Sequence, residues 1–127
     1  MKNTITDKNG DPVIIEATAL TPIAYKHIFG GDMLKDLKEI RGGDRERTDF
    51  FELCSQMAFV MATQAANLKD TSAVMSADKA GYYDFLNDYE SNYFQNPDVQ
   101  GVILATWFNN ASVIDKIKNL QSPPKEN

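Results

Sequence analysis

The longest periodic run of apolar residues spans positions 48–68 and predicts a central helix. Apolar side chains recur there at steps of three and four residues, a spacing that places them in one stripe of an α-helix. No charged residue occurs between Glu52 and Lys69. Small and aromatic residues flank the stripe, so we expect other helices to cover this one on more than one side. The stripe contains Phe50, Leu53, Cys54, Met57, Ala58, Met61, Ala65 and Leu68, and its flank contains Phe51, Phe59, Ala62 and Ala66.

Residues 1–18 read as an extended N-terminal arm. Asn9-Gly10 is a strong signal for a two-residue hairpin turn. Apolar Val13 and Ile15 then alternate with other side chains, as in a half-buried strand. Pro12 cannot donate a ladder hydrogen bond. We therefore predict a short hairpin, or a single strand, docked on the helices.

Two short helices are predicted before the central one. Thr21-Pro22 has the pattern of an N-cap followed by proline at the first helical position. Gly30-Gly31 ends this helix, because glycine accepts the left-handed conformation found at helix ends. Asp32 can then cap a helix over residues 33–40. The residues expected to face inward are Ile23, Ala24, Tyr25, Ile28 and Phe29 in the first helix and Met33, Leu34, Leu37 and Ile40 in the second.

Beyond the central helix, residues 69–81 are mostly polar or small and predict a loop. Aromatic residues at helical spacing predict a helix over residues 82–93. Asn96-Pro97 repeats the capping pattern and begins a helix with Trp107 near its end. A last apolar segment follows Ser112. The tail at 122–127 contains two prolines, and we expect it to be disordered.

These elements predict a mainly α fold. We expect one helical domain over residues 1–121, with about five to six helices around the central helix 48–68 and a short N-terminal hairpin or strand. The chain has 127 residues, which suits a single domain. Apolar residues make up 43% of it, enough for a packed core.

Charge and composition narrow the class of partner. The net charge of −5 argues against nonspecific binding to nucleic acid, which requires clustered lysine and arginine. No run of about 18 apolar residues occurs, so no membrane span is expected. The first residues lack the apolar core of a signal peptide. Cys54 is the sole cysteine, which excludes an intrachain disulfide and fits a cytosolic setting.

No residue pattern indicates an enzyme, a cofactor site or a metal site. His27 lies on the polar side of its predicted helix with no acid and nucleophile beside it in the sequence. Cys54 falls in the apolar stripe, where a structural thiol is expected. Asp84 and Asp88 stand one helical turn apart and leave a shared metal open, although a solvated helix face is the preferred interpretation. The three arginines of residues 41–47 leave an anion site open against a solvated loop.

Aromatic residues and methionines are dense enough to supply both a core and a binding surface. At helical spacing most of them should be buried. Those left over would form an exposed patch for a partner protein. The candidate partner-binding residues are Phe59, Met61, Tyr83, Phe94, Trp107 and Phe108.

The segment 17–37 carries, in order, a Thr-Pro, an aromatic-basic pair, a Phe-Gly, an aspartate and an Asp-Leu. This order resembles the N-terminal signature of tail assembly chaperones from long-tailed phages and prophages of Gram-positive bacteria. Residues 58–62 (AFVMA), residues 83–86 and Trp107 resemble later elements of that family, with less specificity. Gly31 and Tyr83 depart from the family pattern, which more often has a charged residue and a tryptophan there. The signature residues are Thr21, Pro22, Tyr25, Lys26, Phe29, Gly30, Asp32, Asp36 and Leu37.

The resemblance implies a non-enzymatic protein that acts in the host bacterial cytoplasm and is absent from the mature virion. Such proteins bind the tape measure protein, keep it soluble and assist polymerisation of the tail tube protein around it. Contact with the tail tube protein is implied through a longer, frameshifted form. We also expect a homo-oligomer, since many copies must coat one long client. The alternative is a structural phage adaptor or tail completion protein that stays in the virion, and a DNA-binding regulator is disfavoured by the charge.

Overall fold

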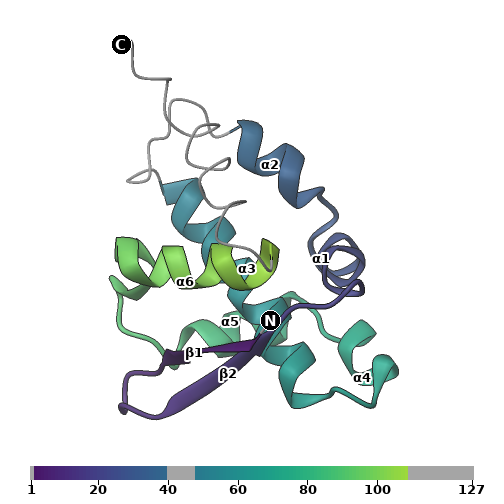
Figure 1. The fold of residues 1–127 in the computed structure, drawn as a ribbon, viewed down its shortest axis with the longest axis horizontal. Coiled ribbons are helices and arrows are strands. Elements are labelled where there is room, and N and C mark those ends of the chain that lie inside the picture. Colours follow the sequence, from purple (N-terminus) through teal and green to yellow (C-terminus); the bar gives the residue numbers. More distant parts are fainter. Residues whose placement is uncertain (1, 40–47, 109–127) are drawn as a thin grey trace.

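The computed structural model describes residues 2–39 and 48–108 (Figure 1). In these ranges the chain is mainly α-helical and begins with a two-stranded antiparallel hairpin, which confirms the predicted fold class. Four predicted features lie outside the described residues: Ile40 as an inward-facing residue, the arginine-containing loop, the segment after Ser112 and the tail at 122–127.

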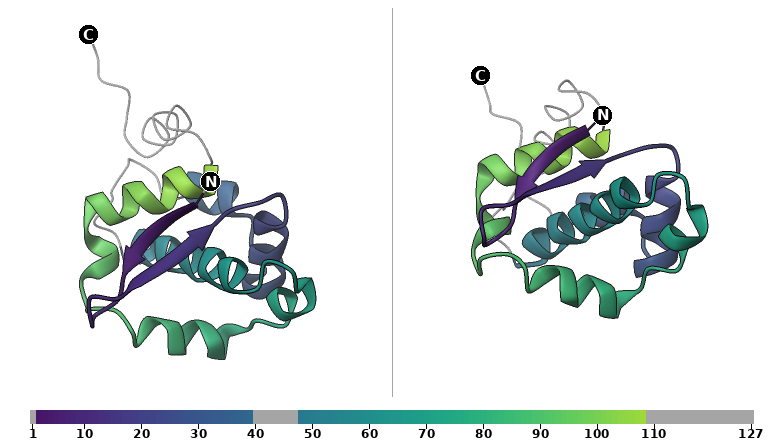
Figure 2. Two further views of the ribbon diagram at one scale, coloured as in Figure 1. Left: turned by 60° about the horizontal axis from the view of Figure 1, so that its bottom comes forward. Right: turned by 90° about the horizontal axis from the view of Figure 1, so that it is seen from below.

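The elements follow one another closely along the chain. They are β1 (Lys2–Thr6), β2 (Pro12–Glu16), α1 (Thr21–Phe29), α2 (Met33–Glu39), α3 (Thr48–Ala66), α4 (Thr71–Met75), α5 (Lys79–Leu86), the 3-10 helix η2 (Tyr93–Gln95) and α6 (Pro97–Phe108). The hairpin and α6 lie on one side of α3, and α5 lies on the opposite side (Figure 2).

Helix α3 is the centre of the fold, as predicted. It contacts β2, η2 and every other α-helix of the described chain. Its stripe side chains Phe50, Met57 and Met61 are fully buried. The prediction was wrong for Leu68, which is 52% exposed. The helix ends at Ala66, so Leu68 lies beyond it and does not follow the helical spacing that places the other stripe residues in the core.

The flank of α3 is covered mainly by aromatic rings. Phe59 is buried, and its ring packs against those of Phe29, Tyr82 and Phe85 from α1 and α5. Farther along the helix this cover ends, and Ala66 is exposed. The flank is therefore closed at Phe59 and open at its C-terminal end.

The N-terminal hairpin forms around the predicted Asn9-Gly10 turn. Gly10 adopts a left-handed backbone with φ 83°, a conformation that favours glycine. The Asp7 carboxylate accepts the N–H groups of Asn9 and Asp11 and closes the turn. Ile5 and Ile15, on the inner face of the hairpin, are buried in the core.

Helix α1 begins differently from the prediction. Leu20 occupies the N-cap position without a side-chain hydrogen bond, and Thr21 is the first helical residue. The Thr21 hydroxyl instead accepts the Thr18 N–H and donates to the side chain of Gln64 on α3. The Thr21 hydroxyl, which was expected to cap α1, therefore donates to the buried Gln64 side chain instead. The predicted end of α1 is confirmed, since Gly30 has φ 79°.

Two apolar residues predicted to face inward are exposed. Ile23 in α1 is 58% exposed and Leu34 in α2 is 48% exposed. Both helices are short, and the buried side of α1, which packs toward α3, contains Thr21, Ala24, Tyr25 and Ile28. The opposite side of α1 is therefore left uncovered.

The region after α3 holds more structure than the predicted loop. Asp70 caps α4 by accepting the Ala73 N–H, and Asp78 caps α5 by accepting the Gly81 N–H. Aspartate at these positions begins both helices, and α4 has little apolar periodicity of its own. The predicted helix 82–93 is also shorter than expected and ends at Leu86.

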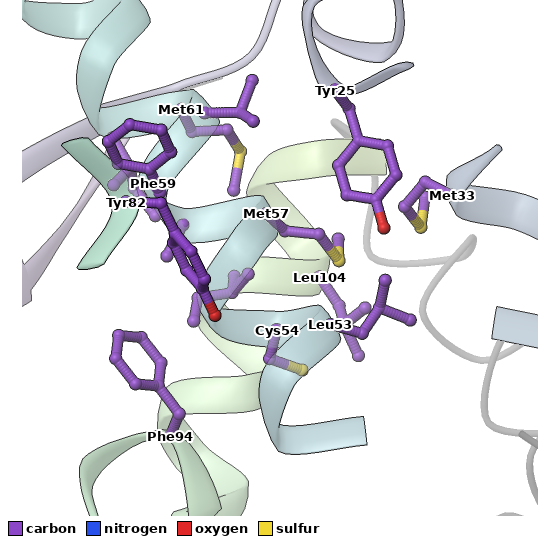
Figure 3. Packing of buried hydrophobic residues seen from close by; sticks show 14 of the residues in the cluster. Tyr25, Met33, Leu53, Cys54, Met57, Phe59, Met61, Tyr82, Phe94 and Leu104 are labelled. Carbon is purple, nitrogen blue, oxygen red and sulfur yellow. The ribbon is translucent and has the colours of Figure 1, made fainter. Parts of the chain in front are cut away.

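Helix α6 begins as predicted. The Asn96 side chain accepts the Asp98 N–H, so Asn96 caps the helix ahead of Pro97. Ile103 and Leu104 are buried on its inner side. Figure 3 shows Leu104 beside Leu53 of α3, where these two helices pack together.

Candidate functional site

An apolar groove lies between the corner formed by α1 and α2 and the end of α6. Its volume is about 410 Å³. We call it the corner groove. It is lined by Pro22, Ile23, Lys26, Gly31, Asp32, Met33, Leu34, Trp107 and Phe108.

The packing of α1 turns one side of that helix toward the groove. Ala24, Tyr25 and Ile28 are buried. Ile23 and Lys26 lie between them in sequence and are exposed. The inward stripe of a nine-residue helix therefore leaves an apolar and a basic side chain on the groove wall.

The turn between α1 and α2 brings the second wall into place. Asp32 begins α2 by accepting the Lys35 N–H on its carboxylate. At Gly31, an added Cβ would lie 2.5 Å from Oδ2 of Asp36. A side chain at position 31 would therefore displace the Asp36 carboxylate, so glycine fits this turn without displacing it.

The base of the groove is held by Tyr25. Its hydroxyl lies 3.2 Å from Asp36 Oδ2 and 3.2 Å from Gln56 Oε1, so α1 is linked to both α2 and α3. Burial, and then the Asp36 carboxylate, raise the pKa of the Tyr25 hydroxyl well above its ordinary value. The hydroxyl therefore stays protonated and donates. Figure 3 shows Tyr25 and Met33 entering the core from α1 and α2.

The third wall comes from α6. The ring of Trp107 stands edge-on to that of Tyr25, with centroids 5.7 Å apart. Trp107 and Phe108 are half-buried, so each contributes both to the core and to the groove surface. Lys26 and Asp32 supply one charge of each sign. The groove therefore suits an apolar surface rather than a strongly charged ligand.

The signature residues assemble at this corner. Thr21, Tyr25 and Leu37 are buried, Gly30 turns the chain, and Asp36 faces Tyr25. The ring of Phe29 packs on the ring of Tyr82, with their centroids 5.1 Å apart. The remaining three signature residues, Pro22, Lys26 and Asp32, line the corner groove.

Three predicted partner-binding residues do not form a surface. Phe59, Met61 and Phe94 are 6%, 0% and 8% exposed. Rings from α1 and α5 cover Phe59, and the ring of Tyr89 packs on Phe94. These residues belong to the core. Tyr83 is 58% exposed but does not line the groove. Trp107 and Phe108 do line it.

The groove residues missed by sequence reasoning are Ile23 and Leu34, which were predicted to face inward and are exposed. Met33 also lines the groove but is buried, as predicted. A signal was present, because apolar residues on both sides of such a short helix cannot all reach one neighbour. What the sequence does not show is which side remains open.

The other candidate groups have ordinary surroundings. His27 is exposed, and Cys54 is fully buried, as predicted for both. Asp84 and Asp88 are exposed, and the described ranges hold no group of three or more histidine, cysteine, aspartate or glutamate residues placed to bind a metal. No helix within residues 2–39 and 48–108 has the length and apolar character needed to cross a membrane.

Comparison of the chain with protein-family models, with curated proteins and with solved structures found no match. The functional interpretation therefore depends on the sequence signature and on the groove that three of its residues line.

Proposed function

We propose that this chain is a phage tail assembly chaperone that binds the tape measure protein through the corner groove. The observation that carries the proposal is the position of the signature. Its residues both build the α1–α2 corner and, through Pro22, Lys26 and Asp32, line an apolar groove. The proposed activity is non-enzymatic and takes place in the host cytoplasm.

The physical chemistry of the groove fits such a client. A tape measure protein is a long helical protein that exposes apolar helix faces before assembly. An amphipathic helix lays such a face into an apolar groove and uses a few large side chains as anchors. Ile23, Leu34 and Trp107 offer apolar contact area, and Lys26 and Asp32 can pair with either charge on the client. The net charge of −5 favours solubility of the complex.

Co-expression with the tape measure protein of the same phage tests the proposal. The unaltered chain should hold the client in the soluble fraction and co-purify with it. Leu34→Asp places a charge in the groove and should abolish capture. Leu68→Asp is the matched control, because Leu68 is similarly exposed but lies outside the groove. Equal insolubility of the client with and without the chain contradicts the proposal.

A structural adaptor retained in the virion is the rival function. Mass spectrometry of purified particles separates the two, since the chaperone should be absent and the adaptor present. Self-association, and contact with the tail tube protein through a longer form, belong to the same proposal. Size-exclusion chromatography with light scattering tests self-association.

A further inference from the structure

The hydrogen-bond alternation of the hairpin shows which backbone groups point away from it. The Asp7 N–H donates to the Asp11 carbonyl at 3.0 Å, so these residues form a hydrogen-bonded pair. The pairs Ile5–Val13 and Asn3–Ile15 are hydrogen-bonded by the same alternation. The N–H and C=O groups of Thr4, Thr6, Ile14 and Glu16 therefore point outward.

The two edges of the hairpin differ in their cover. On the β1 edge, the Thr6 N–H donates to the Tyr93 hydroxyl at 2.8 Å, and the Asn3 side chain donates to Thr106 of α6. On the β2 edge, the outward backbone groups of Ile14 have no hydrogen-bond partner among residues 2–39 and 48–108. The Ile14 side chain is 54% exposed. Helix α6 packs mainly against β1, so the β2 edge at Ile14 is the less covered of the two.

A hollow runs beside this edge. Its volume is about 310 Å³, and it lies between β2, the C-terminal half of α3 and α5. We call it the edge groove. Its apolar lining includes Val13, Ala62, Ala66 and Phe85, and Asp7 and Asp88 lie at one end. Figure 2 shows β2 in front of α3, with α5 on the far side of α3.

We propose that the β2 edge binds an extended, basic peptide segment of a partner protein as a third strand. In antiparallel pairing, the peptide residue opposite Ile14 exchanges two N–H···O=C bonds with it. The neighbouring peptide side chains then point to the inner face, where the small residues Ala62 and Ala66 leave room for apolar groups. Pairing weakens toward Pro12, which has no N–H to donate.

The charge at the end of the edge groove selects a basic peptide. Asp7 and Asp88 line that end, and Asp11 lies in the adjoining turn. Lys8 is the one basic residue of this turn, and its N–H donates to the Asp88 carbonyl at 2.7 Å. Three carboxylates against one ammonium leave this end negative. In antiparallel pairing the C-terminal end of the peptide lies here, so a lysine or arginine belongs at that end.

The inference is independent of the proposed function. The edge groove and the corner groove have no lining residue in common. Either surface can fail to bind while the other binds.

An NMR titration of the isotope-labelled full chain tests the inference. The probe is an eight-residue peptide of alternating threonine and valine that ends in an amidated lysine. The amide signals of Ile14, Glu16 and Ala62 should shift, while those of Ile23 and Leu34 should not. Ile14→Pro removes the outward N–H and should weaken binding about tenfold. Thr4→Pro removes an outward N–H on the opposite edge, beside which α6 packs, and should leave binding unchanged.

Two further comparisons keep the test decisive if a proline variant fails to fold. The unaltered chain should bind a probe that is N-methylated at the threonine opposite Ile14 about tenfold more weakly. Asp88→Asn should weaken binding of the lysine probe about two- to fivefold, while Asp84→Asn, on the same stretch but outside the edge groove, should not.

The contrary results are equally specific. Absence of shifts at β2, or equal binding of the N-methylated probe, overturns the inference. Self-association in sedimentation without peptide, abolished by Ile14→Pro, would assign the edge to a second copy of this chain and also overturn the inference.

Discussion

The ring of Trp107 meets the ring of Tyr25 edge-on, with an interplanar angle of 89° and centroids 5.7 Å apart. This contact joins the end of α6 to the signature segment in α1. Tyr25 in turn hydrogen-bonds to α2 and α3. Four helices therefore meet at one pair of rings, and the shape of the corner groove depends on that pair.

Replacing Trp107 should weaken both the fold and the groove. Trp107→Leu removes an aromatic pair and part of a half-buried surface, and we expect a loss of about 1–3 kcal/mol in the free energy of unfolding. Urea denaturation followed by circular dichroism measures it. Tyr83→Leu, at an exposed ring, should change stability by less than about 0.5 kcal/mol. Equal losses in the two variants would contradict the structural role of Trp107.

Trp107 is also the sole tryptophan, so its fluorescence reports on the corner groove. A client helix that fills the groove should shift the emission to shorter wavelength and reduce quenching by acrylamide, because the indole loses contact with water. The threonine-valine probe of the β2 edge should change neither property. A response to that probe would mean that the two grooves are coupled or that the probe binds elsewhere.

Alkaline pH should destabilise the fold through its buried tyrosines. Burial raises the pKa of Tyr25, Tyr82 and Tyr89 above the ordinary value. Above about pH 10 the unfolded chain loses these protons first, so the free energy of unfolding falls by up to about 1.4 kcal/mol per pH unit for each tyrosine. Below that pH these groups do not change the free energy of unfolding as the pH varies. Melting temperatures between pH 8 and 11 should show this bend, and Tyr25→Phe should make it shallower.

The hydroxyl of Thr21 should matter for stability rather than for helix capping. It donates to Gln64 Oε1 at 2.7 Å, and both residues are buried. Thr21→Val leaves that acceptor without its donor and should cost about 1–3 kcal/mol. Adding Gln64→Leu should recover part of the loss in a double-mutant cycle. Strict additivity of the two changes would show that the pair does not interact.

Gly31 should be sensitive to a side chain because of one neighbour. An added Cβ lies 2.5 Å from Asp36 Oδ2, so Gly31→Ala must displace that carboxylate from the Tyr25 hydroxyl. We expect a loss of about 1–2 kcal/mol. In an Asp36→Ala background the same change should cost much less. A cost that persists in that background would point to backbone strain instead.

Much of the fold follows from local pattern. The wide apolar run predicted α3, Asn9-Gly10 predicted the hairpin turn, and Asn96-Pro97 predicted the start of α6. These signals depend on short-range geometry, which the sequence displays directly. Helix α4 and the first turn of α5 escaped prediction, because aspartate caps begin them and no apolar periodicity marks them in the sequence.

The candidate site was only partly predictable, because it depends on what remains uncovered. Periodicity identifies apolar residues such as Ile23 and Leu34 but not which helix faces them. Phe59 shows the reverse case, because this aromatic residue was assigned to a surface and is covered by rings distant in sequence. Exposure is a property of the packed molecule, so local pattern leaves it open.

The hydrogen bond from Asn3 to Thr106 closes the fold across 103 residues of sequence. During synthesis the hairpin and α3 leave the ribosome well before Ile103 and Leu104, which complete the core. Until α6 emerges, the nascent chain presents an apolar side of α3 to its surroundings. Folding must therefore wait for the last described helix, and this protein passes through its own aggregation-prone stage before it becomes compact.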